Sequence, residues 1–225
     1  MRRFFLEDGG IDLGAIVLRG DPAHHLMHVL RLQPGDTVVV FDGTGRELAC
    51  VLREAFKDEA HLSPIEPVRT VAETPSIHLL IALTKGPAMD SAVRMATEAG
   101  VTHIHPLLTA RSVARGERTD RWERIAVSAA QQSRRPTVPE VAPIVDIEAG
   151  IRAIPTSYDR RIATPGGPRQ GAPAGPSAVL IGPEGGLSPY ESDLAQAIGF
   201  TPQGLGRFIL RVETAAAVAV ALLAP

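Results

Sequence analysis

Two short loops near the end of the chain combine glycines with ionisable side chains. The first, residues 182–186 (Gly-Pro-Glu-Gly-Gly), follows the apolar run 179–181. Glycines carry no side chain, so backbone amides and carbonyls of such a loop can approach a flat ligand closely. The alternative is a plain strand-to-helix turn. A helix is predicted to begin just after the loop, because Ser188 suits an N-cap, Pro189 suits the first helical position and Glu191 completes a capping box.

The second loop carries the candidate chemistry. Leu205 and Gly206 precede the run 207–210, and Arg211, Glu213 and Thr214 then open an Ala-rich helix. Helix starts have free N–H groups and a positive dipole end, so polar chemistry gathers there. Arg211 can stabilise a developing negative charge, and Glu213 can accept a proton or orient Arg211. The alternatives are a structural Arg211–Glu213 ion pair and Thr214 as the N-cap of the last helix.

Both loops resemble motifs of the SPOUT class of RNA methyltransferases, specifically the bacterial enzymes that methylate N3 of a uridine in small-subunit ribosomal RNA. The resemblance covers nearly the whole chain and is carried by the loops and by the shorter segments 2–5, 24–32, 35–43, 85–86, 96–101 and 129–133. That family usually has Glu where this chain has Gln131, Gly in place of Arg134, and a Gln-Lys pair in place of Arg94 and Met95.

The resemblance implies a cofactor, S-adenosylmethionine, bound in a deep trefoil knot by backbone groups, with no metal. It also implies a homodimer with the active site near the subunit boundary. The cofactor-binding residues that it implies are Thr164, Ile181, Gly182, Glu184, Gly185, Gly186, Leu205, Gly206, Ile209, Leu210 and Thr214. The uridine N3 must lose a proton before it can attack the methyl group, which gives Arg211 and Glu213 their predicted catalytic roles.

The charge of the chain does not by itself attract nucleic acid. The net charge is −2, so binding to ribosomal RNA or to an assembled subunit needs local patches. The predicted RNA-binding residues are Arg2, Arg3, His25, Arg31 and Arg134, with the pairs Arg134-Arg135 and Arg160-Arg161 as further candidate patches. The alternative for each residue is an exposed side chain at the rim of the domain that contacts water and not RNA.

Composition limits the other classes. Cys50 is the single cysteine, which excludes a disulfide framework, and together with the lack of a signal-peptide core it favours the cytoplasm. No apolar run reaches the roughly 18 residues of a membrane span. His24, His25 and His28 lie close together, but no carboxylate or cysteine pattern with metal-site spacing accompanies them, so a helix face is the preferred explanation.

The pattern along the chain predicts an α/β protein with two domains. Residues 1–71 are expected to form a small β-barrel (PUA-like) that holds RNA, with a hairpin over 36–52 and a short helix over 24–30 whose apolar residues Leu26, Val29 and Leu30 share a face. A linker is expected over 63–75. Residues 76–225 alternate strands with helices, which predicts a parallel sheet covered on both faces. The predicted strands are 77–83, 101–108, 158–163 and 179–181, and the predicted helices are 89–99, 120–132, 146–153 and the Ala-rich C-terminal one.

The sequence leaves three alternative functions, one of them disfavoured. The chain could be a non-catalytic RNA-binding protein that keeps the fold, or a SPOUT methyltransferase with another RNA target. A dinucleotide-binding dehydrogenase is disfavoured, because no G-x-G-x-x-G follows a strand with an acidic residue about 20 positions on.

Overall fold

The computed structural model describes residues 2–7, 11, 14, 16–71, 75–112 and 119–224. The chain divides into two compact units. The first comprises Met1–Glu73 with Ala130–Val138, and the second comprises Thr74–Ala129 with Pro139–Pro225. Each unit has its own buried core and is described by itself.

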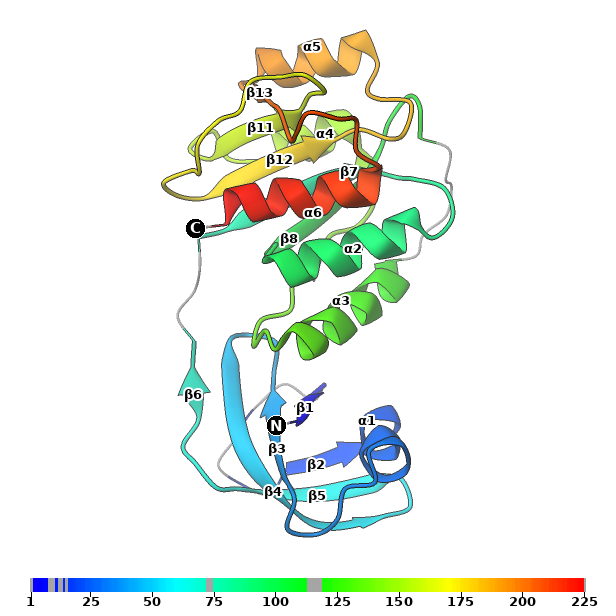
Figure 1. The fold of residues 1–225 in the computed structure, drawn as a ribbon, viewed down its shortest axis with the longest axis vertical. Helices are drawn as coiled ribbons and strands as arrows, with labels where there is room; N and C mark the ends of the chain where they lie inside the picture. The colour runs from blue at the N-terminus through cyan, green and yellow to red at the C-terminus, as the bar shows by residue number, and fades with distance from the viewer. Residues whose placement is uncertain are drawn as a thin grey trace. The chain divides into compact units, whose positions relative to one another are not determined.

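The first unit is a curled sheet around an apolar core. Its strands are paired in the order β1-β3-β4-β5-β2, with β6 on β4, and only the β1–β3 pairing is parallel. The predicted hairpin is confirmed as β3 and β4, joined by a turn in which Gly43 and Gly45 have φ values of 81° and 102°. The strands are β1 (Arg2–Phe5), β2 (Ile16–Arg19), β3 (Thr37–Phe41), β4 (Arg46–Phe56), β5 (Glu59–Pro64) and β6 (Arg69–Thr70) (Figure 1).

The predicted short helix consists of two pieces. Helix α1 (Asp21–His24) continues directly into one π-helical turn, η1 (His25–Val29). Leu26 is fully buried in the core of this unit and Leu30 packs against the same core, but Val29 is 60% exposed, so the prediction is wrong for Val29. The wider π-helical turn changes the angular spacing that an α-helical pattern assumes.

The predicted linker over 63–75 is only partly irregular. Ser63 and Pro64 end β5, and Arg69 and Thr70 form β6 against β4. Residues 72–74 lie outside the described ranges. Proline and charge are tolerated at such sheet edges, which explains why their presence did not exclude strands here.

The second unit contains a parallel sheet, as predicted. Its order is β10-β8-β7-β12-β11-β13, with β9 beside β8, and these strands of the described residues all pair in parallel. The sequence patterns did not identify the short strands β9, β10 and β13. The strands are β7 (Ile77–Ala82), β8 (His103–Leu108), β9 (Glu140–Val141), β10 (Val145–Asp146), β11 (Asp159–Ala163), β12 (Ser177–Ile181) and β13 (Thr201–Gln203).

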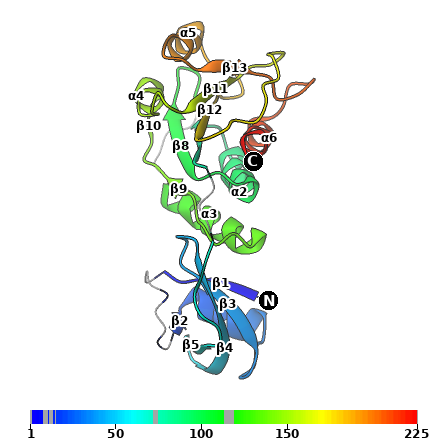
Figure 2. The same ribbon diagram turned by 90° about the vertical axis from the view of Figure 1, so that its left-hand side faces the viewer.

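Helices cover both faces of this sheet, as Figure 2 shows. Helices α2 and α6 pack together on one face, and α4 and α5 pack on the other around Leu80, Leu107 and Leu180. Gly100 ends α2 in the left-handed conformation, as predicted for a helix C-terminus. The helices are α2 (Ala88–Ala99), α3 (Thr119–Ser133), α4 (Ile147–Arg152), α5 (Pro189–Ala197) and α6 (Val212–Leu223).

The last helix is buried along one side, which explains its apolar composition. Val212, Ala216, Ala219, Val220 and Leu223 are all buried in α6. Small alanines allow this helix to approach α2 and the sheet closely. None of the helices in the described ranges combines the length and apolar character that a bilayer span requires.

Candidate functional site

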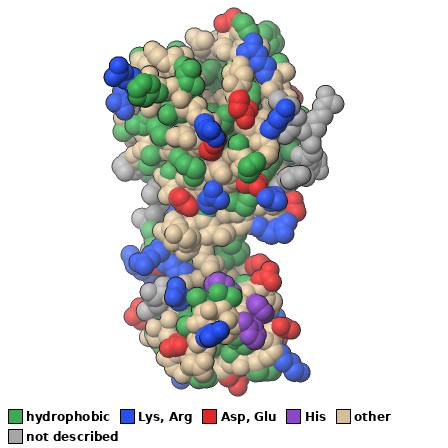
Figure 3. All heavy atoms as spheres, turned by 45° about the vertical axis from the view of Figure 1, so that its right-hand side comes forward, with side chains coloured by type: hydrophobic (Ala, Val, Ile, Leu, Met, Phe, Trp, Pro, Cys, Tyr) green, Lys and Arg blue, Asp and Glu red, His purple; other side chains and the backbone are tan. Residues whose placement is uncertain are grey.

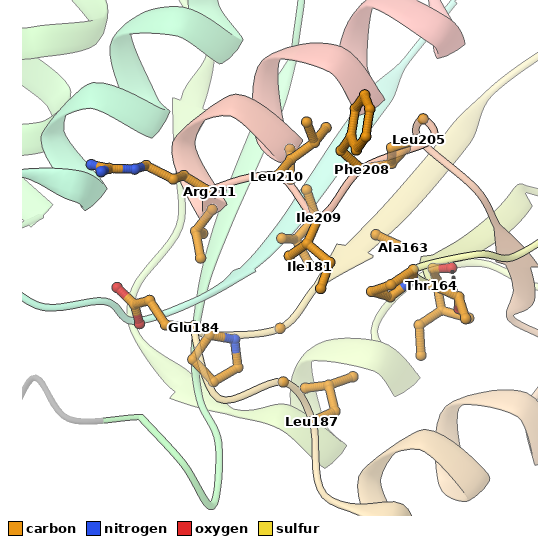
Figure 4. Close-up of a pocket in the computed structure, with 18 of the residues that line it drawn as sticks. Ala163, Thr164, Ile181, Glu184, Leu187, Leu205, Phe208, Ile209, Leu210 and Arg211 are labelled. Atoms are coloured by element: carbon orange, nitrogen blue, oxygen red, sulfur yellow. Dashed lines mark hydrogen bonds between the residues drawn. The ribbon is translucent and has the colours of Figure 1, made fainter.

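A cavity of about 560 Å³ opens where three parallel strands of the second unit end. Its walls come from the ends of β11 and β12 and from the loop between β13 and α6 (Figure 4). Ligands of open parallel sheets bind outside the carboxyl ends of the strands, so the position suits a binding site. The lining residues are Ile162–Pro165, Ile181–Glu184, Gly186, Leu187, Ser192, Leu205, Gly206, Phe208–Val212 and Ala215.

The first predicted loop forms one wall of the cavity. The helix start after it is confirmed: the Ser188 side chain accepts from the Glu191 N–H, the Glu191 carboxylate accepts from the Ser188 N–H, and Pro189 is the first residue of α5. Gly182 leaves no room for a side chain, because a Cβ there would lie 3.0 Å from the Leu187 nitrogen.

The predicted residues of this wall do not all face the cavity. Ile181, Gly182, Glu184 and Gly186 line it, and Gly186 has a φ of 71°. Gly185 is not among the lining residues, and a Cβ on Gly185 would point to the Arg111 side chain.

The second predicted loop forms the facing wall. Leu205, Gly206, Ile209, Leu210 and Arg211 all line the cavity. Ile209 and the neighbouring Phe208 remain 86% and 75% exposed. Thr164, at the end of β11, completes the wall from a third segment, and its hydroxyl donates to the Ile162 carbonyl.

Arg211 presents an unpaired guanidinium at one end of the cavity. In Figure 4 it and Glu184 lie at the same end, opposite to Thr164. Among the described residues, none is hydrogen-bonded or ion-paired to the Arg211 side chain, so the alternative of an Arg211–Glu213 ion pair is not realised. An exposed guanidinium without an internal partner can bind an external oxyanion.

The prediction that Thr214 caps the last helix is wrong. The N-cap residue is Arg211, with φ −65° and ψ 155°, and no side chain of the described residues caps this end. Glu213 and Thr214 therefore lie within the first turn of α6, and neither lines the cavity. The sequence prediction placed the helix start too late, because Thr214 is of a type that favours the N-cap and the residues before it are not.

A buried arginine of β11 joins three segments of the second unit. Arg161 is only 2% exposed and forms a two-pronged ion pair with Asp159, at 2.8 and 2.9 Å. It also donates to the Gln203 side chain at 2.9 Å and to the Gly171 carbonyl at 2.8 Å. The hydrogen bonds from Arg161 hold the pKa of Asp159 below its usual range, against the opposing effect of burial. Arg161 is thus a buried structural group, and the predicted RNA patch at Arg160-Arg161 is wrong.

The predicted RNA-binding residues all belong to the first unit, in different environments. Arg2, His25, Arg31 and Arg134 are exposed. Arg3 instead pairs with Glu47 at 2.8 Å, and its side chain is only 10% exposed. That geometry gives Arg3 a structural role in the sheet.

One departure from the family pattern has a visible structural effect. Arg134 follows α3 with a φ of 64°, and the Arg135 N–H bonds back to the Ala130 carbonyl at 2.9 Å. That is the helix ending which favours glycine, so the usual family residue fits this backbone better than Arg134 does.

Histidine side chains gather on the first unit, as Figure 3 shows. The rings of His24 and His28 lie 4.6 Å apart, between centroids, and are tilted by 42° to each other. Within the described part of the chain, no group of three or more histidine, cysteine or acidic side chains is arranged to hold a metal ion.

Comparison with known proteins identifies the family and the fold. Residues 72–224 match the model of an RNA methyltransferase domain, and residues 18–65 match the RNA methyltransferase PUA domain. The chain belongs to this family of RNA methyltransferases. The resemblance of the two loop motifs is thereby confirmed, as is the α/β fold with a PUA-type N-terminal domain.

Relatives within the family cover nearly all of this chain. A Synechocystis protein named ribosomal RNA small subunit methyltransferase E is 36% identical over 88% of this chain and 69% of its own length. A Bacillus subtilis protein of the same name is 29% identical, over 96% and 93%. The crystal structure of the Neisseria gonorrhoeae protein of that name, bound to S-adenosyl methionine, superposes with a TM-score of 0.90 at 30% identity, covering 98% and 95% of the two chains.

Several residues that shape the pocket were not identified from the sequence. Arg111, Gly167, Gly204 and Gln203 act through contacts with segments distant in the chain. Among these four residues only Gly204 had a local indication, since it precedes Leu205 and Gly206 in a Gly-Leu-Gly sequence. The predicted cofactor-binding residues include Gly206 but not Gly204.

Proposed function

We propose that this RNA methyltransferase transfers a methyl group from S-adenosylmethionine to N3 of a uridine in small-subunit ribosomal RNA. The observation that carries the proposal is the unpaired Arg211 guanidinium at the end of a glycine-walled cavity. The names of the relatives indicate the class of RNA, and the Neisseria gonorrhoeae structure indicates the donor.

The cavity fits such a donor in size and in surface. Its volume of about 560 Å³ lies within the range of roughly 300–1,000 Å³ for small-molecule sites. Ile181, Leu205, Ile209 and Leu210 give it apolar walls for a flat base, and Gly182, Gly186 and Gly206 leave backbone groups accessible. When bound, S-adenosylmethionine supplies a methyl group on a positively charged sulfur, which is activated for transfer to nitrogen.

The role of Arg211 is to stabilise negative charge on the nucleotide. A uracil that loses its N3 proton carries that charge largely on its two carbonyl oxygens, and a guanidinium donates hydrogen bonds to such oxygens. Because Arg211 has no partner among the described residues, no internal ion pair has to break first. Positioning of the uridine beside the donor supplies a further part of the rate gain.

A carboxylate near Arg211 is needed to receive the N3 proton or to orient the guanidinium. Glu213 has this role in the proposal. Glu184, which lines the cavity at the same end as Arg211, is the second candidate. Gly185 and Thr214 complete the proposed donor set as loop and helix-start residues that lie behind the wall.

The remaining parts of the proposal concern assembly. The segments around β11, β12 and α6 are proposed to form the trefoil knot of this enzyme class, and two copies are proposed to form a homodimer in the cytoplasm. The exposed Phe208 and Ile209 beside the cavity support a partner subunit there. The first unit is proposed to bind RNA through Arg2, His25, Arg31 and Arg134.

The experiment is methylation of small ribosomal subunits, and of protein-free RNA, that lack the modification, with isotopically labelled S-adenosylmethionine. We expect one labelled 3-methyluridine per subunit by nucleoside mass spectrometry, and a reverse-transcription stop at its position, because N3 methylation blocks base pairing. A label at another atom of uridine would refute the position, and RNA binding without any label would favour a non-catalytic binding protein.

A further inference from the structure

A side chain from a segment distant in the sequence hydrogen-bonds to the glycine loop of the cavity. Arg111 lies in the loop after β8, and its Nη1 atom donates to the Gly185 carbonyl at 2.7 Å and to the Leu187 carbonyl at 3.3 Å. The acceptors lie 74 and 76 residues later in the chain. Arg111 itself does not line the cavity, so any influence on a bound ligand passes through the loop.

The neighbouring residue provides a second tie between the same two segments. The Ala110 N–H donates to the Glu191 carboxylate at 2.7 Å, and the other oxygen of that carboxylate accepts the Ser188 N–H at 2.7 Å. Glu191 is 4% exposed. Burial alone would raise its pKa, but these hydrogen bonds and the charge of Arg111 outweigh burial and lower it. The Glu191 side chain that joins these two segments is therefore an ionised carboxylate.

The glycine loop needs such external ties. Glycines lose more conformational freedom on ordering than other residues, and residues 182–186 contain three of them. Within the loop, the Gly186 N–H donates to the Pro183 carbonyl at 2.8 Å. This hydrogen bond closes one turn, but it does not fix where the turn lies relative to the rest of the second unit. Arg111 fixes that position, because its charged donor binds one carbonyl within the turn, that of Gly185, and one just after it, that of Leu187.

The place of Gly185 agrees with this arrangement. A Cβ on Gly185 would lie 3.5 Å from the Arg111 Cδ atom, so this residue faces Arg111 and not the cavity. Of the two hydrogen bonds that Arg111 donates to the loop, the one to the Gly185 carbonyl is the shorter. Gly185 thus contributes to the site through Arg111.

We propose that Arg111 is a positioning residue for methyl-donor binding, which holds the glycine loop in its binding conformation through the Gly185 and Leu187 carbonyls. The proposal rests on the proposed place of the donor in the cavity. A loop that is already ordered binds its ligand more tightly, because the ordering cost is not taken from the binding free energy.

The test is calorimetric titration of S-adenosylmethionine into the full chain and its variants. Arg111→Met should raise the donor Kd about tenfold, since two hydrogen bonds from a charged group are lost. Arg111→Lys, which keeps a charged donor, should stay within about threefold of the wild type. The matched control is Arg152→Met, which removes an exposed arginine paired with Glu148 at 2.9 Å on α4, and which should leave the Kd unchanged.

Kinetics separate positioning from catalysis. In Arg111→Met the KM for the donor should rise about tenfold, whereas kcat at saturating donor should stay within about threefold. Circular dichroism checks the fold, and if Arg111→Met does not fold, Arg111→Gln, whose side chain is shorter and uncharged, replaces it.

Wild-type donor affinity in folded Arg111→Met would overturn the proposal, as would an equal loss in Arg152→Met or a tenfold loss of kcat at saturating donor. A wild-type chain that binds no S-adenosylmethionine would instead overturn the proposed function.

Discussion

Gly204 packs so closely against Gly167 that the place of a Cβ atom on Gly204 is taken by the Gly167 carbonyl oxygen. The Gly204 N–H also donates to the Pro168 carbonyl at 2.7 Å. This contact joins the loop after β11 to the segment after β13, and each contributes a neighbouring residue, Thr164 and Leu205, to the cavity wall. The shape of the pocket therefore depends on a backbone contact that only glycine permits.

Substitution of Gly204 by alanine should disturb both stability and donor binding. The added methyl group must displace backbone, so we expect the free energy of unfolding to fall by about 2 kcal/mol. The measurement is chemical denaturation, with donor titration beside it. Gly175→Ala is the control, from the loop that holds Gly167, because a Cβ on Gly175 meets no atom within 4 Å. Equal stability of Gly204→Ala and the wild type would show that the loops can separate without cost.

Loss of the Arg211 guanidinium should affect chemistry more than binding. If Arg211 stabilises the uracil anion, Arg211→Ala should lower the single-turnover rate at saturating RNA by about a hundredfold or more. Donor affinity should change little, because backbone groups and apolar walls surround the donor. Arg207→Ala removes a charge from an exposed arginine of the same loop that does not line the cavity, and it serves as the matched control. A full single-turnover rate in Arg211→Ala would remove this residue from the catalytic set.

At Arg134 stability and RNA binding should respond in opposite directions. A residue with a side chain in the left-handed conformation costs about 1 kcal/mol relative to glycine, so Arg134→Gly should raise the free energy of unfolding by up to that amount. If the exposed guanidinium contacts phosphate, the same change should weaken RNA binding and flatten its salt dependence. Denaturation and filter binding at several salt concentrations measure the two effects. Unchanged RNA affinity would assign Arg134 to the solvated rim.

A stack of histidines in the second unit should make stability depend on pH. The His78 ring stacks on His103 at 4.1 Å, hydrogen-bonds His105 at 2.9 Å and Ser76 at 3.0 Å, and meets the edge of Tyr158 at 5.3 Å. Burial, with the charges of His103 and His105, lowers the pKa of His78 from 6.5 to about 4. Burial is also the main cause that lowers the pKa of His105, which His103 lowers further and Glu140 raises.

The direction of the pH effect follows from these pKa values. The unfolded chain takes up a proton on His78 near pH 6.5, and the folded chain does so only near pH 4. The stabilisation is therefore complete above pH 6.5 and is lost as the pH falls toward 4. Urea denaturation measures how far the free energy of unfolding falls between pH 7 and pH 5. We expect this fall to be about 1 kcal/mol smaller in His78→Gln than in the wild type. His28→Gln, at an exposed position, should keep the wild-type profile. An identical loss in both variants would exclude His78 as the source.

Much of the fold follows from local signals in the sequence. The capping box of Ser188 and Glu191 and the end of α2 at Gly100 were predictable, because capping depends on residues a few positions apart. The apolar strands predicted over 77–83 and 179–181 are observed as Ile77–Ala82 and Ser177–Ile181. The motifs of the two loops were specific enough to indicate an RNA methyltransferase. The short strands β9, β10 and β13 were missed, since two or three residues carry no detectable period.

By itself the sequence determined the family, the two glycine loops and most of the residues that line the cavity. Only the tertiary structure decided that Arg211 stands without an internal partner among the described residues, that Arg161 is buried, and that Gly185 faces Arg111. The physical reason is that local conformation depends on neighbouring residue types. Burial, close backbone approach and the partners of an arginine are instead set by segments that meet only after the chain has folded.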